Sequence, residues 1–109
     1  NGRIAWVLCP ADLGDGLQLA NDAMGEMMPH LIGIEGVLVA MMLKPGRTPG
    51  EWKLSLRSKA AVKVGHVAMT RGGGGHDHAA GATLAGEPHA LCRSLLDDLL
   101  ATLRDQVPE

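Results

Sequence analysis

The sequence has almost no aromatic residues, since Phe and Tyr are absent and Trp occurs only twice among 109 residues. Nucleic-acid-binding sheets of the RNA-recognition and OB types stack bases on aromatic rings, and this chain has almost nothing for that purpose. Apolar residues still make up 46% of the chain. The sequence therefore predicts an aliphatic core and argues against a base-stacking sheet.

Cysteine is also scarce, and Cys9 and Cys92 are too few for a disulfide framework. The sequence has no secretory signal and no apolar run of membrane-spanning length, so we expect free thiols, a cytoplasmic location and no membrane partner. Neither a Gly-Lys-Ser/Thr nor a Gly-x-Ser-x-Gly motif occurs, which excludes a Walker loop and a nucleophile elbow. His76 and His78 invite a metal site, but the spacing that structural zinc needs is missing, and we expect no metal.

The chain length predicts one domain spanning residues 1–109. The chain begins with Asn1 and enters an apolar run within three residues, so we expect a domain excised from a longer protein. The apolar pattern predicts an α+β fold in which helices cover one mixed sheet of about four strands and the last helix is long. The predicted strands are Arg3–Cys9, Val37–Leu43, Trp52–Ser58 and Ala82–Leu84, and the predicted helices are Asp15–Met28, Val64–Thr70 and Glu87–Val107.

Smaller features complete this prediction. Asp12 or Asp15 is expected to cap the first helix, Pro29 to break or kink it, and His30–Ile34 to form a short turn. The turn residues of Pro45–Gly50 predict an antiparallel hairpin between the second and third strands.

The third predicted strand alternates apolar and polar residues. Because side chains alternate between the two faces of a strand, Trp52, Leu54 and Leu56 should face the core. Lys53, Ser55 and Arg57 should face outward together, so that one face carries a hydroxyl beside a guanidinium.

A run of four glycines, Gly72–Gly75, is followed by His76-Asp77-His78-Ala79-Ala80-Gly81. Glycine lets the backbone take positive φ and lets a ligand approach the main-chain N–H groups closely. The run ends abruptly rather than continuing as a polar linker, which favours an ordered functional loop. If His76–Ala80 is helical, its N-terminus would offer unpaired donors to an anion.

Positive charge is concentrated before this run. The net charge is only −2, but the segment from Lys44 to Arg71 holds seven Lys and Arg residues and a single acid, Glu51. A solvated surface is one interpretation, and local phosphate binding beside the glycine run is the other.

The final predicted helix carries a leucine stripe from Leu91 to Leu103, and Pro88 suits its first turn. Core packing is the expected role of this stripe. A purely structural alternative, in which the stripe forms a homodimer and the glycine run only turns the chain, stays open.

Three motifs occur in a recognisable order: Leu54-Ser55-Leu56-Arg57-Ser58, then Val62 to Ala68, then Gly72–His76 with Ala79-Ala80-Gly81. In this order and spacing they resemble the DHH-associated C-terminal domain, type 1, of the DHH phosphoesterase superfamily. The resemblance extends from about Leu17 to the final helix, and it is greatest to the oligoribonuclease and phosphoadenosine-phosphate phosphatase type.

The resemblance implies a hydrolase whose separate N-terminal DHH domain holds two Mn²⁺ ions on Asp and His ligands. The associated domain would be its partner and would hold the substrate, a short oligonucleotide or phosphorylated nucleotide, without a catalytic residue, metal or cofactor of its own. This chain has no Asp-His-His triplet, so it is expected to be inactive alone. The substrate-binding residues implied are Ser55, Arg57, Ser58, Gly72, Gly73, Gly74, Gly75 and His76.

Two positions depart from the family pattern, because Lys63 stands where relatives often have Asp and Arg71 stands where an aromatic residue commonly precedes the glycines. The alternatives are a cyclic-dinucleotide phosphodiesterase domain, and a tRNA-binding module like the C-terminal part of alanyl-tRNA synthetases. The tRNA modules tend to have Arg at the position of His76 and Gln at that of Ala80. The residues present therefore favour the phosphoesterase branch.

Overall fold

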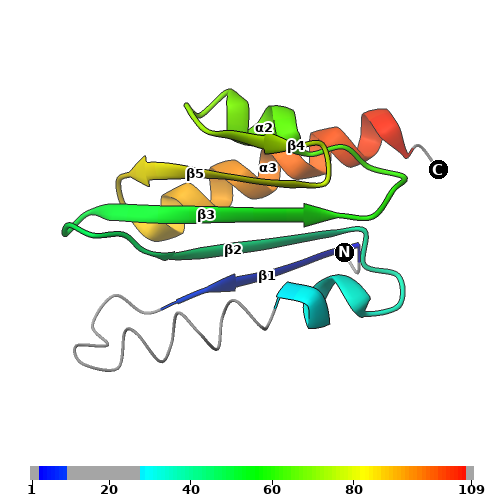
Figure 1. Ribbon diagram of the computed structural model, residues 1–109, viewed down its shortest axis with the longest axis horizontal. Helices are drawn as coiled ribbons and strands as arrows, with labels where there is room; N and C mark the ends of the chain where they lie inside the picture. Colours follow the sequence, from blue (N-terminus) through cyan, green and yellow to red (C-terminus); the bar gives the residue numbers. More distant parts are fainter. Residues whose placement is uncertain (1–2, 10–27, 108–109) are drawn as a thin grey trace.

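The computed structural model describes residues 3–9 and 28–107. These residues form one mixed sheet of five strands in the order β1-β2-β3-β5-β4, with helices on both of its faces (Figure 1). The strands are β1 (Ile4–Leu8), β2 (Val39–Pro45), β3 (Glu51–Ser58), β4 (Gly74–His76) and β5 (Ala79–Ala85), and the labelled helices are α2 (Gly65–Met69) and α3 (Pro88–Gln106). The predicted α+β class and the long last helix are confirmed, and the sheet has one strand more than expected.

The apolar strand β2 lies in the interior of the sheet, between β1 and β3. Its first five residues are buried, which confirms that this strand is apolar on both faces. β2 pairs in parallel with β1 and antiparallel with β3, as expected for the hairpin. The strand begins at Val39 rather than Val37. At the entry to the sheet, Leu38 and Val39 both donate their backbone N–H to the Arg3 carbonyl, at 2.7 and 3.1 Å.

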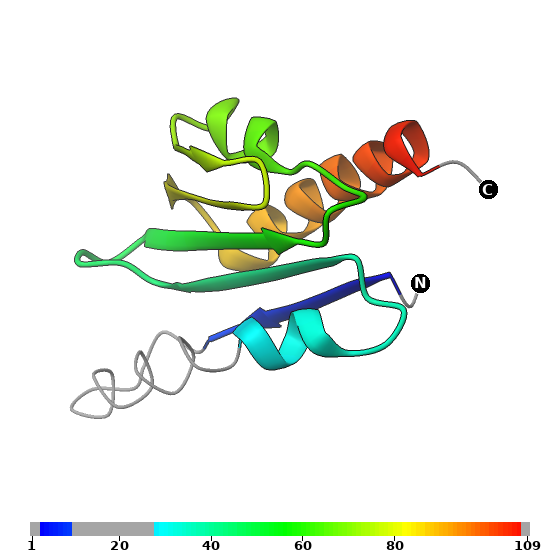
Figure 2. The same cartoon turned by 45° about the vertical axis from the view of Figure 1, so that its right-hand side comes forward.

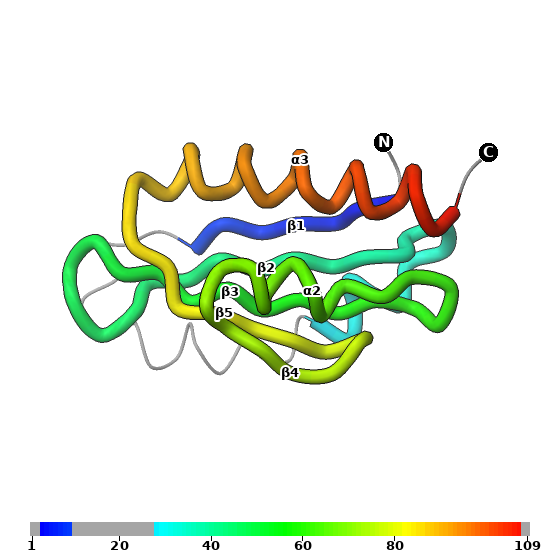
Figure 3. The backbone as a smooth tube through the Cα atoms, turned by 90° about the horizontal axis from the view of Figure 1, so that it is seen from above, coloured from blue at the N-terminus to red at the C-terminus, as the bar shows by residue number. Residues whose placement is uncertain are grey.

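One face of the sheet carries the main core. Val39, Met41 and Leu43 of β2 pack there with the inward side chains of β3 and with α2 and α3. Figure 3 shows α3 running along the strands on this side. In α3 the predicted stripe is confirmed as core, since Leu95, Leu99 and Leu103 are buried.

Helix α3 starts where the sequence indicates. The Glu87 carboxylate accepts a hydrogen bond from the Ala90 backbone N–H at 2.9 Å, and Pro88 occupies the first turn. The N-terminal backbone groups of a helix have no partner within it, so this cap fixes the helix start.

The opposite face carries a smaller core at the β1–β2 end. Cys9, Ala40 and Met42 are buried there together with Met28, the first residue of a helical segment at residues 28–33 (Figure 2). Residues 28–33 are helical, so the expected break at Pro29 and the expected turn at His30–Ile34 are wrong, whereas the alternative of a kink at Pro29 stays a prediction. Proline's fixed φ is compatible with helix. The expected helix Asp15–Met28 and its caps Asp12 and Asp15 lie outside the described residues, apart from Met28 itself.

The segment after the glycine run is a hairpin rather than a helix. His76 ends β4, Asp77 and His78 form the turn, and Ala79 begins β5, which is four residues longer than the predicted strand. β5 pairs with β3 along its whole length, so sheet pairing overrides any local helical preference of the small residues. The helix N-terminus expected to bind an anion at His76–Ala80 does not exist.

The two thiols predict a response to alkaline pH. Burial raises the pKa of the Cys9 thiol, with the Lys44 ammonium opposing the shift, and burial followed by the Glu87 charge raises the pKa of the Cys92 thiol. A raised folded pKa means that the stabilising contribution is complete below the ordinary thiol pKa, about 8.5, and is lost as the pH rises through the folded value. We expect urea unfolding between pH 7 and 10 to show a steeper loss of stability for the wild type than for Cys9→Ala/Cys92→Ala. Identical slopes for the two proteins would contradict this expectation.

Candidate phosphate-binding face

The site residues expected from the sequence divide between the two faces of β3. Leu54 and Leu56 are buried in the main core, while Ser55 is half-buried and Arg57 is exposed on the other side. Ser58 falls on the core side, and its hydroxyl donates to the Val62 carbonyl at 2.6 Å. Ser58 therefore shapes the turn that follows β3 and does not lie beside Ser55 and Arg57.

Strand pairing carries the open face from β3 across β5 to β4. Ala79 lies directly opposite Arg57 on one side and directly opposite His76 on the other. Residues paired in this way point to the same face, so Arg57 and His76 lie on one face of the sheet. Their Cα atoms are two strand spacings apart, which is about 10 Å. In the next row, Gly81 lies between Ser55 and Gly74.

The tip of the β4–β5 hairpin is tied to the rest of the fold. Ser58 donates its backbone N–H to the His78 carbonyl at 3.0 Å, and Val64 donates to the Asp77 carbonyl at 2.7 Å. These bonds hold the exposed His76 at a fixed place across from Arg57.

Each glycine of the run has its own environment. Gly72 has φ +83° and donates its N–H to the Met69 carbonyl at 3.1 Å, and Gly73 donates to the Ala68 carbonyl at 2.9 Å. This is the hydrogen-bond pattern of a Schellman motif that ends α2. The backbone donors of Gly72 and Gly73 are therefore already used within the fold.

The last two glycines differ in what a side chain would meet. At Gly75, φ is +132° and a Cβ would lie 2.6 Å from the Ala79 carbonyl oxygen, so the fold itself requires glycine. At Gly74 a Cβ would have nothing within 4 Å. Gly74 is thus the glycine of the run whose lack of a side chain the described fold does not explain, and it faces the open side beside Gly81.

Arg57 has a defined orientation. Its Nη1 donates to the Leu56 carbonyl at 2.9 Å, which uses one of the five N–H donors of the guanidinium. No carboxylate of the described ranges forms an ion pair with it. The remaining donors can bind two oxygens of a phosphate at once.

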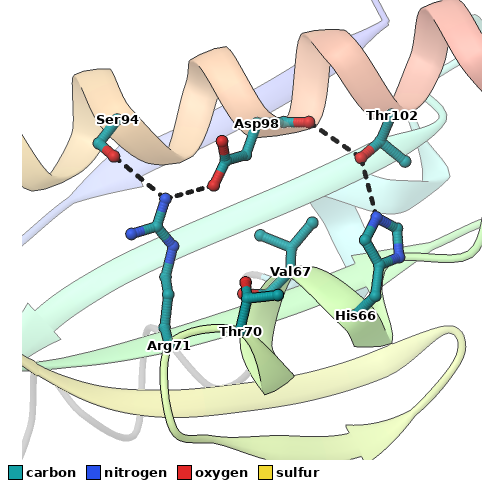
Figure 4. A network of polar contacts seen from close by, with 7 residues as sticks. All are labelled: His66, Val67, Thr70, Arg71, Ser94, Asp98 and Thr102. Carbon is teal, nitrogen blue, oxygen red and sulfur yellow. Dashed lines mark hydrogen bonds and ion pairs between the residues drawn. The ribbon is translucent and has the colours of Figure 1, made fainter.

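Arg71, the departure from the family pattern, points to the other side of the sheet. It donates to Ser94 at 3.1 Å and forms an ion pair with Asp98, both on α3 (Figure 4). Arg71 therefore fastens the start of the glycine run to α3 and adds no charge to the face of Arg57. The other departure, Lys63, is exposed, and its backbone is held by the Gln106 side chain.

A second contact in the network of Figure 4 joins α2 to α3. The Thr102 hydroxyl gives its single hydrogen to the Asp98 carbonyl, so His66 Nε2 must be the donor in its 3.1 Å contact with Thr102.

Two cavities differ in charge. A cavity of about 420 Å³ between α2 and α3 is lined in part by Asp98 and Asp105, which suits an anion poorly. A cavity of about 460 Å³ opens beside Ser55, and its wall includes Lys44 and Lys53. The full lining of this second cavity is Lys44, Lys53, Leu54, Ser55, Gly72, Gly73, Gly81, Ala82 and Thr83.

Sequence reasoning did not include Lys44, Lys53 or Thr83 among the site residues. The alternation of β3 places Lys53 on the outward face with Ser55, so a signal for Lys53 was present. Lys44 and Thr83 could be added only from the strand register, in which both lie directly opposite Lys53.

Two further observations concern the described residues as a whole. No three His, Cys, Asp or Glu side chains gather into a metal-binding group within residues 3–9 and 28–107. In the same ranges no helix has both the length and the apolar character needed to cross a bilayer.

Comparison with solved structures supports the fold. An exopolyphosphatase-related protein from Bacteroides fragilis matches with a TM-score of 0.78 and 20% identity, over 99% of this chain and 31% of its own. PggH, a pGpG-specific phosphodiesterase from Vibrio cholerae, matches with a TM-score of 0.53 and 16% identity, over 62% of this chain and 25% of its own. This chain thus corresponds to less than a third of either protein.

Sequence comparison gives the family. Among curated proteins none matches this chain significantly. The profile of the DHHA1 domain, however, matches residues 6–109, nearly the whole chain. The open face with Ser55, Arg57 and His76 therefore belongs to a member of the DHHA1 domain family.

Proposed function

We propose that this chain is the substrate-binding domain of a DHH-family phosphoesterase, and that it binds phosphate groups of short oligonucleotides or phosphorylated nucleotides. The observation that carries the proposal is the convergence of Ser55, Arg57 and His76 on one open face whose floor is made of Gly74, Gly81 and Ala79. The fold relatives include a pGpG-specific phosphodiesterase and an exopolyphosphatase-related protein, whose names both refer to phosphate-rich substrates.

Each side chain has a separate task in this proposal. Arg57, oriented by the Leu56 carbonyl, holds two oxygens of one phosphate. His76 donates a ring N–H to the same phosphate or to its neighbour, and the Ser55 hydroxyl donates from the side. The glycine floor lets the ligand lie close to the sheet, where a larger residue would lift it away.

Hydrolysis is assigned in this proposal to a separate DHH domain. The described residues of this chain do not fit a two-metal centre, because no group of carboxylates and histidines comes together. In this proposal the two Mn²⁺ ions belong to that other domain. Mn²⁺-dependent turnover of an oligonucleotide by this chain alone would contradict this division of labour.

The test is a titration without metal of the chain with a 5′-phosphorylated dinucleotide, at low and moderate salt. Loss of a charge-assisted contact in Arg57→Ala or His76→Ala should weaken binding by about 1.5 to 3 kcal/mol. Arg93→Ala is the matched control, because it removes one positive charge from α3 on the other side of the sheet. Binding that is indifferent to both site substitutions would refute the proposal, and a steep salt dependence from many phosphate contacts would favour the tRNA-binding alternative.

A further inference from the structure

The cavity beside Ser55 is lined by a row of three polar residues that have no role in the proposed function. Lys44 of β2 and Lys53 of β3 lie directly opposite each other on adjacent antiparallel strands, and Thr83 of β5 lies opposite Lys53 on its other side. The three residues form one row across the open face, next to the row that holds Ser55 and Gly81. This row brings two ammonium groups and a hydroxyl to one cavity wall.

Two like charges directly opposite each other on paired strands destabilise a sheet. Within the described part of the chain, neither lysine forms an ion pair with a carboxylate. The acid nearest in sequence, Glu51, is occupied in the β2–β3 turn, where its carboxylate accepts the Arg47 backbone N–H at 3.0 Å. Lys44 is also half-buried, so solvent screens the repulsion between the two charges only in part. An anion between the lysines would remove this repulsion.

We propose that the cavity lined by Lys44, Lys53 and Thr83 is a second phosphate subsite, so that the domain holds two phosphate groups of one linear ligand. The inference rests on the proposed function, in which Arg57 holds the first phosphate. Lys53 and Arg57 are four residues apart on β3, so their Cα atoms are separated by about 13 Å. Ser55 lies midway between them on the same face.

The floor between the two subsites is low enough for a ligand to cross. Gly81 lies beside Ser55, and the Cβ position of Gly74 is open. A ligand with a single phosphate can occupy only one subsite. The structure therefore selects a short linear chain carrying several phosphates, either a phosphodiester backbone or inorganic polyphosphate.

The experiment compares ligands of different length on the 109-residue chain. AMP, a 5′-phosphorylated trinucleotide and linear polyphosphate are titrated into the wild type and into Lys53→Gln, Lys44→Gln and Arg93→Gln. Each lysine substitution should weaken the longer ligand about tenfold and change AMP binding by less than about twofold. For the trinucleotide, the slope of log affinity against log salt should become shallower by about 0.7. Loss with the trinucleotide, with polyphosphate or with both supports the subsite and identifies which chain it accepts.

The melting temperature gives a second test, because the same substitution that weakens binding should stabilise the ligand-free fold. Because the paired lysines repel each other, Lys53→Gln should raise the melting temperature of the ligand-free chain by about 1 to 2 °C. A lysine that served only the fold would lower the melting temperature when replaced. Unchanged binding of both longer ligands to the lysine variants would overturn the second subsite. Arg57→Ala is titrated alongside these variants. If it still weakened binding in that case, the proposed function would stand without the second subsite, whereas a wild type that bound none of the three ligands would overturn both.

Discussion

Replacing Gly73 by alanine should destabilise the fold by about 3 kcal/mol or more, whereas the same change at Gly74 should alter the free energy of unfolding by less than about 1 kcal/mol. At residue 73 a Cβ would lie 2.6 Å from the Ala82 Cβ and closer still to the Gly81 carbonyl oxygen. These atoms belong to β5, which is fixed between β3 and β4, so they cannot move aside cheaply. At residue 74 the Cβ position is empty and φ is not positive.

Urea unfolding of the two variants measures the difference, with the wild type as reference. Affinity for the ligand tests the second variant, because a methyl group at residue 74 projects over the glycine floor. We expect Gly74→Ala to remain folded and to bind the 5′-phosphorylated dinucleotide more weakly than the wild type. A Gly74→Ala protein with unchanged affinity would show that the ligand does not lie on this floor. A fully stable Gly73→Ala protein would contradict the close approach of residue 73 to β5.

The elements that were predictable from the sequence are those in which burial dictates the pattern. β2 is apolar on both faces because each face meets one of the two cores. β3 alternates because only one of its faces meets the main core, and α3 shows a leucine stripe because one side of it is buried. In each of these elements the local pattern and the tertiary packing agree, so the pattern alone was sufficient.

The glycine run was harder to interpret, because glycine and alanine carry no pattern. The sequence indicated an ordered loop, and the structure divides that loop into a helix end at Gly72 and a strand from Gly74. The β4–β5 hairpin is formed by pairing with β3, a long-range interaction that local propensity cannot show. The expected break at Pro29 was wrong because proline's fixed φ is compatible with helix, and Leu31 and Ile32 of this segment pack on the smaller core.

The sequence was sufficient to choose the residues of the candidate site, but only in part to show which of them lie close together. Alternation along β3 is sufficient to put Ser55 and Arg57 on one face. The position of His76 across from Arg57 depends on the register of β5 between them. Ser58 was grouped with them by the motif, yet it lies on the core side, since a strand changes face at every residue.

The two faces of β3 predict the other large effect. Leu56 is fully buried in the main core, so Leu56→Ala should lower the free energy of unfolding by about 2 to 5 kcal/mol. Ser55, its neighbour, lies on the open face, and Ser55→Ala should change stability by no more than about 0.5 kcal/mol. The two substitutions are adjacent in sequence but remove atoms from opposite sides of one strand.

Measured together, stability and affinity distinguish the tasks of these faces. At a temperature where both variants are folded, Leu56→Ala should bind the 5′-phosphorylated dinucleotide as the wild type does, because its cavity opens on the far side of the sheet from Arg57. Ser55→Ala should keep the wild-type unfolding midpoint in urea and lose affinity, because the lost hydroxyl stands between Arg57 and the cavity of Lys53. Equal loss of affinity in the two folded variants would mean that core packing sets the position of Arg57. The binding face would then depend on the main core, and Arg57 would have to be studied together with Leu56.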